Sequence, residues 1–230
     1  MTQYNVTQWN CCRQNEYDET YLKTKLDTAD ICVMQRCQDK FLSIAKDKFK
    51  FVFHEKHSED CSLVIASNIE FTQPTKHKLP SDQLSFHTLD ANQGSLALSV
   101  YFDGLQLINF QSIYECQYDH VTVTPQHAFD DLRYVFKNVL KNKKCVLLGD
   151  IHEEPEPPSN IKSLIKETNL VSHTDQLMTF GRMDEENNVR GCRHDRIFTL
   201  GNINTSDLQS YAKPQDGNGH WIITYTMHND

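Results

Sequence analysis

The sequence predicts an α/β protein of the α+β type, a two-layer β-sandwich flanked by helices. Three observations support this fold class. Short apolar runs of strand length recur along the chain, and segments with helical spacing of apolar residues interrupt them at intervals. The dipeptide Asp103-Gly104 between two apolar runs is a strong hairpin signal. With 230 residues and no internal repeat, the chain is expected to form one domain over residues 1–230.

The first half of the chain is predicted to be mostly strand. Helices are expected at 17–27 and 41–50, where apolar residues fall near one face. The Pro-containing stretches 72–75 and 79–82 predict turns. Strands are expected at the short apolar runs 6–9, 31–34, 51–53, 62–66, 84–87, 96–102 and 105–110.

The second half alternates helices and strands. Pro125 opens a segment whose apolar residues recur at helical spacing as far as Leu140, which predicts a helix over 125–140. A buried strand is expected at 145–148, a Pro- and Glu-rich loop at 153–158, and a helix from Asn160 onward. The last strands are expected at 195–200 and 221–225.

The composition limits the compartment and the partners. The net charge is -8 and the basic clusters at 46–50 and 137–144 are short, which argues against strong, sequence-independent binding to a nucleic-acid backbone. The eight cysteines show no zinc-finger spacing, residues 1–6 lack the pattern of a secretory signal, and no apolar run is long enough to span a membrane. We therefore expect an intracellular protein, nuclear or cytoplasmic, with free thiols and no membrane partner.

Five short motifs occur in a characteristic order, most of them at the ends of predicted strands. They are Trp9-Asn10, Gln35-Arg36, Asn109-Phe110-Gln111-Ser112, Gly149-Asp150-Ile151-His152 and Arg193-His194-Asp195-Arg196-Ile197-Phe198, the last followed by Gly219-His220-Trp221. Each motif is weak alone, but the ordered set resembles the endonuclease/exonuclease/phosphatase superfamily over nearly the whole chain. Within that superfamily, the last motif, His220-Trp221 and Thr179-Phe180 are similar to tyrosyl-DNA phosphodiesterase 2. The resemblance implies a DNase-I-like sandwich.

The resemblance also implies a centre for phosphodiester chemistry. In such a centre a divalent cation, Mg²⁺, is held by oxygen ligands and draws charge from the phosphate. Carried over to this sequence, Asp150 activates water and His220 donates to a phosphoryl oxygen as charge develops there. The implied catalytic residues are Asp150, His220, Asp195 and His152, and the implied metal ligands are Asn10 and Asp150. The expected substrate-binding residues are Arg193, Arg196, Arg36, Trp221 and Phe180, among which the three arginines are expected to contact phosphate without a metal.

The pattern departs from the family at two important positions. Arg36 stands where the family has its principal metal-ligating Glu, and a guanidinium cannot ligate a cation. Gly219 stands where the family has the Asp that orients the terminal His, so His220 is expected to lose its partner and to be less readily protonated. Gln111 and His152 are further changes. We hypothesise that Arg36 occupies the vacated cation position and pairs with Asp150 or Asp195.

Three functions follow from this pattern. The first is a catalytically inactive member of the superfamily, a pseudoenzyme without cofactor that binds a protein partner, a phosphate-bearing ligand or a nucleic-acid end. The second is an active phosphodiesterase or nuclease with altered use of Mg²⁺, which cleaves a 5′-phosphotyrosyl bond or a nucleic-acid strand. The third is a docking platform marked by exposed aromatic residues around 114–118. The sequence leaves the oligomeric state open.

Overall fold

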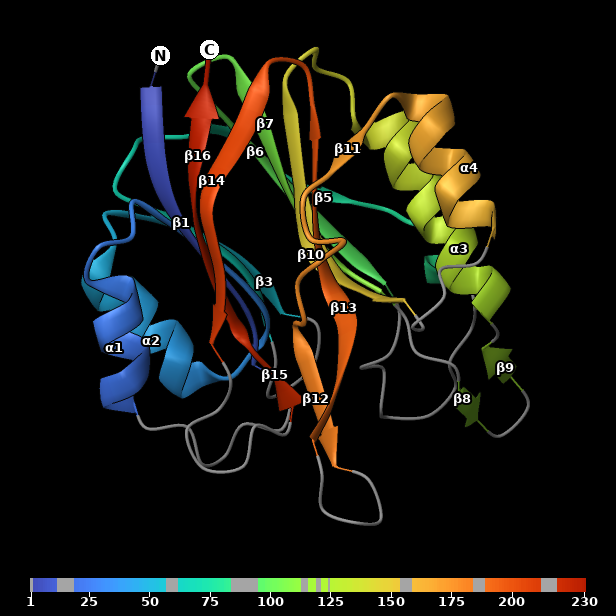
Figure 1. Ribbon diagram of the computed structural model, residues 1–230, viewed down its shortest axis with the longest axis horizontal. Helices are drawn as coiled ribbons and strands as arrows, with labels where there is room; N and C mark the ends of the chain where they lie inside the picture. Colours follow the sequence, from blue (N-terminus) through green and yellow to red (C-terminus); the bar gives the residue numbers. More distant parts are fainter. Residues whose placement is uncertain are drawn as a thin grey trace.

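Two mixed β-sheets face each other across a shared core, and four α-helices among the described residues lie on their outer sides (Figure 1). The computed structural model describes residues 2–11, 19–56, 62–83, 95–112, 116–118, 121–123, 125–153, 159–183, 189–211 and 219–230. The architecture confirms the predicted α/β class and the helix-flanked sandwich. Within these ranges no helix is both long and apolar enough to cross a membrane.

The first sheet has six strands and carries two helices on its outer face (Figure 1). Strands β1 and β2 pair in parallel, and the other neighbours are antiparallel. Its order is β14 (Ile203–Tyr211), β16 (Ile222–Asn229), β1 (Thr2–Asn10), β2 (Ile31–Cys37), β4 (Ser62–Ser67) and β3 (Phe51–Lys56). The helices are α1 (Glu19–Leu26) and α2 (Asp39–Lys48).

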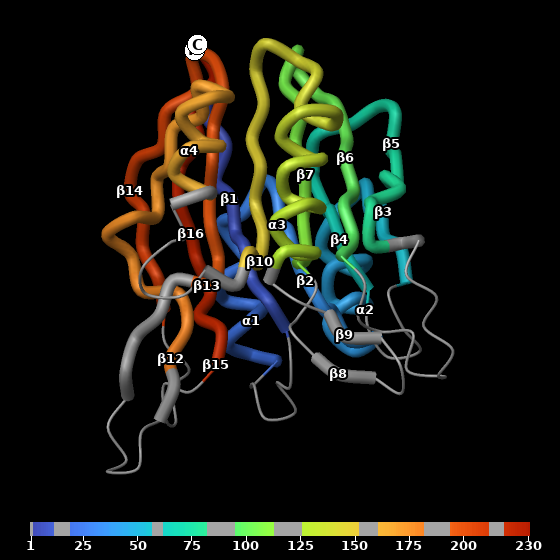
Figure 2. Tube along the Cα trace, turned by 90° about the vertical axis from the view of Figure 1, so that its right-hand side faces the viewer, coloured from blue at the N-terminus to red at the C-terminus, as the bar shows by residue number. Residues whose placement is uncertain are grey.

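The second sheet has eight strands, and the remaining helices cover its outer face and lie in front of it in Figure 2. Its order is β15 (Gly219–His220), β12 (Phe180–Met183), β13 (Val189–Leu200), β10 (Cys145–Glu153), β7 (Leu105–Gln111), β6 (Leu96–Phe102) and β5 (Thr72–His77), with β11 (Val171–Ser172) paired to β13. The outer face carries α3 (Pro125–Tyr134), the π-helical turn η2 (Val135–Val139) and α4 (Ser159–Thr168). Outside the two sheets lie the 3-10 turn η1 (Pro80–Gln83) and the small hairpin of β8 (Cys116–Tyr118) and β9 (Val121–Val123).

Alternation along the strands divides the apolar residues into three layers. In β2, Ile31 and Val33 face the core between the sheets, whereas Cys32 and Met34 face α1 and α2. In β10, Leu147 packs on the outer side under α3 and α4. A strand buried on both faces reads as a continuous apolar run, which is why these strands were visible in the sequence.

Strands with polar sequences were not predicted. Residues 72–75 were expected to form a turn, and this prediction is wrong, because β5 begins there as an exposed edge strand paired with β6. Strands β12 and β14 were also missed. The helix predicted over 125–140 is divided into α3 and η2. The strand predicted at 84–87 and most of the loop predicted at 153–158 lie outside the described residues.

Candidate active site

The inward-facing positions of several strands change from apolar to polar at the end of the sandwich where β12 and β15 lie (Figure 1). In β10 the inward series is Val146, Leu148 and then Asp150. Strand pairing sets the polar ends beside one another: Asn10 opposite Gln35, Gln111 opposite Asp150, and Asp150 opposite Asp195. Because side chains alternate with a period of two, the register alone gathers these groups at one interior surface.

Asp150 is fully buried and held by amide donors from both sheets. Its Oδ2 accepts hydrogen bonds from Asn10 Nδ2 at 2.6 Å and from Gln111 Nε2 at 3.0 Å. The preceding Gly149 lets β10 approach β7 this closely, because a Cβ at that position would lie 1.9 Å from the carbonyl oxygen of Phe110. Steric fit therefore explains the glycine of the Gly149-Asp150 dipeptide, and the chemistry of the centre explains the aspartate.

His220 lies between two buried carboxylates. Its Nδ1 is 2.8 Å from Asp195 Oδ2, and its Nε2 is 4.0 Å from Asp150 Oδ2. Burial lowers the pKa of His220, but the charges of Asp195 and Asp150 outweigh this effect and raise its pKa above the ordinary value, against the opposing charge of Arg36.

The expectation that Gly219 leaves His220 without a partner and less readily protonated is wrong. The partner comes from β13, because Asp195 reaches the imidazole from the neighbouring part of the second sheet. Thr179 Oγ1 accepts a hydrogen bond from the Asp195 backbone N–H at 2.9 Å and so fixes that strand. Gly219 itself has φ of 98°, a conformation that favours glycine.

Phe180 and His194 form an aromatic side to the centre. The two rings stack at 4.4 Å with an interplanar angle of 11°, and Phe180 also contacts His220 edge-on at 4.8 Å. Phe180, expected to bind substrate, therefore packs against both imidazoles. His194 was missed by the sequence reasoning. The available signal was a ligand-type residue at the variable position of the motif that begins at Arg193.

Arg36 lies at an irregularity in β2, near enough to the centre for its charge to act on His220. The pairing of β2 with β4 shifts between Met34 and Cys37, Arg36 adopts φ of 48°, and Cys37 packs on the outer side. This bulge breaks the regular alternation of side chains at Arg36. Its charge acts on His220 and lowers the pKa of that imidazole. The ion pair hypothesised with Asp150 or Asp195 stays a prediction.

The other predicted site residues are placed differently. Arg196 follows Asp195 on the opposite face of β13, where it pairs with Asp175 and donates to Ser172 Oγ at 2.9 Å, so the structure does not bring it to the centre. Trp221 is partly exposed and donates its backbone N–H to Thr179 O at 2.8 Å. His152 and Arg193 lie in strands, but their side chains are outside the described residues.

A metal ion has one candidate group of ligands in the described part of the chain. It consists of Asp150, His194 and His220, whose ligand atoms all lie within 4.8 Å of one another. The predicted Mg²⁺ ligands Asn10 and Asp150 do not fit that ion well. Mg²⁺ prefers an octahedron of oxygens, but Asn10 presents its amide nitrogen to Asp150, and position 36 carries a guanidinium.

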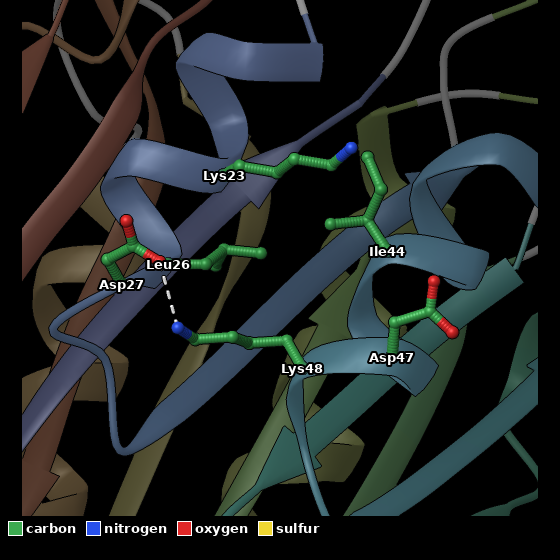
Figure 3. Close-up of a pocket in the computed structure, with 6 residues that line it drawn as sticks. All are labelled: Lys23, Leu26, Asp27, Ile44, Asp47 and Lys48. Atoms are coloured by element: carbon green, nitrogen blue, oxygen red, sulfur yellow. Dashed lines mark hydrogen bonds and ion pairs between the residues drawn. The ribbon is translucent and has the colours of Figure 1, made fainter.

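A separate pocket of about 230 Å³ lies between α1 and α2 (Figure 3). Its charged lining is partly self-paired, since Lys48 Nζ is 2.8 Å from Asp27 Oδ1. The lining residues are Lys23, Leu26, Asp27, Ile44, Asp47 and Lys48. None of these was predicted as a site residue, so the strand-end centre remains the candidate.

Comparison with known proteins identifies the fold. No protein-family model and no curated protein sequence matches the chain. Among solved structures, D. rerio TDP2 complexed with single-strand DNA product matches with a TM-score of 0.69 and 14% identity over 100% of both chains. An endonuclease/exonuclease/phosphatase family protein from Bacteroides thetaiotaomicron matches with a TM-score of 0.67 and 12% identity over 98% of this chain and 95% of that one. The chain has the endonuclease/exonuclease/phosphatase fold.

A third matching structure is that of a phosphatase. The 3′ phosphatase NExo from Neisseria, bound to a product DNA hairpin, has a TM-score of 0.69 and 14% identity over 99% of both chains. These matches confirm the predicted DNase-I-like sandwich. At such low identity the endonuclease/exonuclease/phosphatase fold is what they show, and the chemistry must be argued from the residues of this chain.

Proposed function

We propose that the chain is a phosphoesterase that hydrolyses phosphate esters at nucleic-acid ends. The observation that carries the proposal is the array of Asp150, His220 and Asp195, in which one imidazole lies between two buried carboxylates. A nucleic-acid substrate is supported by the matching structures of TDP2 and NExo, both of which hold a DNA product.

Asp150 is the proposed base. Its carboxylate is buried and aligned by Asn10 and Gln111, so it can orient a water molecule without the cost of reorganising solvent. In the proposed reaction the water oxygen bonds to phosphorus and its proton passes to Asp150, while the bond from phosphorus to the ester oxygen breaks and the leaving oxygen takes a proton from solvent.

His220 is the proposed stabiliser of the phosphoryl oxygens. Its pKa is raised by Asp195 and Asp150, which favours the protonated imidazolium near neutral pH. Asp195 occupies Nδ1, so the Nε2–H points to the side on which Asp150 lies and can donate to an oxygen that gains charge there.

Arg36 is the proposed fixed cation. The resemblance implies a Glu and a divalent cation at this position, whose charges of -1 and +2 sum to the +1 of a guanidinium. Arg36 already acts electrostatically on His220, so its charge is near enough to act on a bound phosphate. On this view, substitution by Arg leaves the charge of the centre unchanged while it removes the need for Mg²⁺ at that point.

A non-catalytic binding protein is the second candidate, and Arg36 is the observation that favours it. Arg36, His220 and the deep strand-end position suit capture of a terminal phosphate without turnover. Loss of a principal metal ligand costs orders of magnitude in rate in metal-dependent chemistry. The two candidates differ only in whether bound phosphate esters are hydrolysed.

The deciding experiment is a single-turnover assay on 5′-phosphotyrosyl and 3′-phosphate oligonucleotides, with chelator, Mg²⁺ or Mn²⁺. We expect turnover in chelator, reduced at least about 100-fold by Asp150→Asn and by His220→Gln. Glu167→Gln, on the outer helix α4, is the matched control and should keep wild-type activity. A wild type that binds these oligonucleotides but turns over none of them in any of the three conditions would refute the enzyme and leave the binding protein.

A further inference from the structure

We propose that Asp150, His194 and His220 form a site for a zinc-type transition-metal ion, and that its occupation competes with hydrolysis at the same centre. The inference goes beyond the proposed function, because it concerns a second occupant of the centre and is tested by metal binding alone. It begins from the chemistry of the ligands. Two imidazoles and one carboxylate suit Zn²⁺ with one position left open, whereas Mg²⁺ prefers oxygen ligands throughout.

The distances allow such a site after a small closure. His220 Nε2 and Asp150 Oδ2 are 4.0 Å apart, and all three ligand atoms lie within 4.8 Å. Ligands of a tetrahedral Zn²⁺ lie ~3.4 Å from one another, given bonds of ~2.1 Å. The atoms therefore need to approach by about 1 Å or less. Rotation of the partly exposed His194 ring can shorten its own two distances, and the buried pair of His220 Nε2 and Asp150 Oδ2 must itself close by ~0.6 Å from 4.0 Å.

The surroundings already orient each ligand. Asp195 binds Nδ1 of His220, which leaves Nε2 directed towards Asp150, and this carboxylate–histidine arrangement is the usual support for a metal-bound imidazole. Phe180 packs on the rings of both His194 and His220. Asn10 and Gln111 both donate to Oδ2 of Asp150, so the two amides fix the carboxylate plane.

The local charge also admits a dication. The charged side chains around the three ligands are the carboxylates of Asp150 and Asp195 and the guanidinium of Arg36. Their formal charges sum to -1, and Zn²⁺ changes this sum to +1. A bound anion or hydroxide can balance that charge.

Occupation by metal excludes the metal-free hydrolysis proposed above, because both need the same atoms. The metal takes the Nε2 lone pair of His220 and an oxygen of Asp150, which are the donor and the base of the proposed reaction. The chain would then be silenced by zinc and released by chelation. This exclusion gives the site a regulatory consequence that a purely structural metal would lack.

The test is direct metal binding to the full chain, freed of metal with chelator and kept reduced. Titration with Zn²⁺ against a chromophoric chelator should give one tight site per chain, at least about 100-fold tighter for Zn²⁺ than for Mg²⁺. His194→Phe keeps a ring to stack on Phe180 but removes a ligand nitrogen, and it should weaken zinc binding at least about 100-fold. Asp195→Asn should weaken it about 10- to 100-fold.

Two controls separate this site from other donors. His228→Gln removes an imidazole on β16, away from the cluster, and should leave zinc affinity unchanged. Co²⁺ in place of Zn²⁺ should show visible bands of a nitrogen and oxygen site without the near-ultraviolet thiolate band that cysteine ligands produce. Equal zinc affinity in wild type and His194→Phe, or a thiolate band in the wild type, would overturn the proposal.

The competition between zinc binding and hydrolysis is tested by a separate measurement. If the wild type hydrolyses a phosphate ester, stoichiometric Zn²⁺ should inhibit it at least about 10-fold, and the ratio of rates with and without Zn²⁺ should approach one in His194→Phe. Inhibition that persists in His194→Phe would overturn the competition. Should no substrate be turned over, the proposed function fails, while the binding titration still decides the metal site.

Discussion

The two sheets contribute unequally to the centre. The second sheet provides Asp150, Asp195 and His220 in a connected array, close to the arrangement that the motifs imply. The first sheet provides Asn10, which supports that array, and Arg36, which stands where the family resemblance implies an acid. If Arg36 is the fixed cation proposed above, the centre has a changed ligand on one side and an unchanged electrostatic balance, because the replacement carries the missing charge.

Substitution of Gly149 should have the largest effect on stability of the variants considered, and it acts on the second sheet. A Cβ there would lie 1.9 Å from the backbone oxygen of Phe110, so Gly149→Ala must separate β10 from β7. We expect a loss of at least about 3 kcal/mol in the free energy of unfolding, measured by urea denaturation. Gly104→Ala is the control, because its added Cβ meets nothing within 4 Å. That change should cost about 1 kcal/mol through its positive φ. Similar losses in both variants would contradict the close approach.

Removal of the imidazole tests whether His220 is a cation in the folded protein, where it lies among the acids of the second sheet. His220→Gln removes the imidazole that lies between two buried carboxylates, and we expect a loss of about 3 kcal/mol at pH 6. The pKa of His220 is raised in the folded state, so its contribution is complete below the unfolded pKa and is lost as the pH rises through the folded pKa. The charged groups that set this behaviour are Asp195, Asp150 and Arg36.

The measurement is the difference in unfolding free energy between wild type and His220→Gln from pH 6 to pH 9. The difference should shrink as the pH rises. A difference that is constant or grows over this range would mean that His220 is neutral in the folded protein.

Substitution at position 36 tests what the first sheet contributes to the charge of the centre. Arg36→Glu should restore the implied ligand, so millimolar Mg²⁺ should raise the melting temperature of this variant by several degrees and leave the wild type unchanged. Without metal the variant places a third carboxylate near Asp150 and Asp195, and it should be about 2 kcal/mol less stable than the wild type. Arg36→Gln is the uncharged control. A wild type stabilised by Mg²⁺ as strongly as Arg36→Glu would refute the fixed-cation interpretation.

Substitution of Gln8 should have the smallest effect on stability of the variants considered. It is fully buried in β1, and neither amide atom has a hydrogen-bond partner among the described residues. Gln8→Leu removes this unsatisfied amide at similar volume, and we expect about 1 kcal/mol of added stability in thermal or urea unfolding. Thr7→Val on the same strand is the comparison, because Thr7 Oγ1 donates to Lys25 O at 3.3 Å and its loss should not stabilise. Destabilisation by Gln8→Leu would indicate that ordered water satisfies the amide.

The sequence predicted the fold well because the central strands are apolar on both faces. Strands β2, β7 and β10 therefore appear as short apolar runs, whereas the exposed edge strand β5 and the polar strand β14 carry no such signal. Motif order in turn brought Asp150, Asp195 and His220 under consideration together, and the structure does place them in contact distance.

What the sequence could not give was contact between distant segments. The partner of His220 lies on another strand, so the residue at 219 was a poor guide to its protonation. The inclusion of His194 depends on the pairing of β12 with both β13 and β15. The direction of Arg36 depends on a bulge that no residue type in β2 announces.

The position of β16 has a consequence for how the protein is made. This late segment pairs with β1 on one side and β14 on the other, and the two chain ends meet at the top of Figure 1. During synthesis the first sheet stays incomplete until β16 emerges from the ribosome, and the same delay withholds His220 from its two acids. A premature stop that removes β16 would delete an interior strand rather than fray an edge. Chains of this protein that stop before β16 should therefore be substrates for quality control.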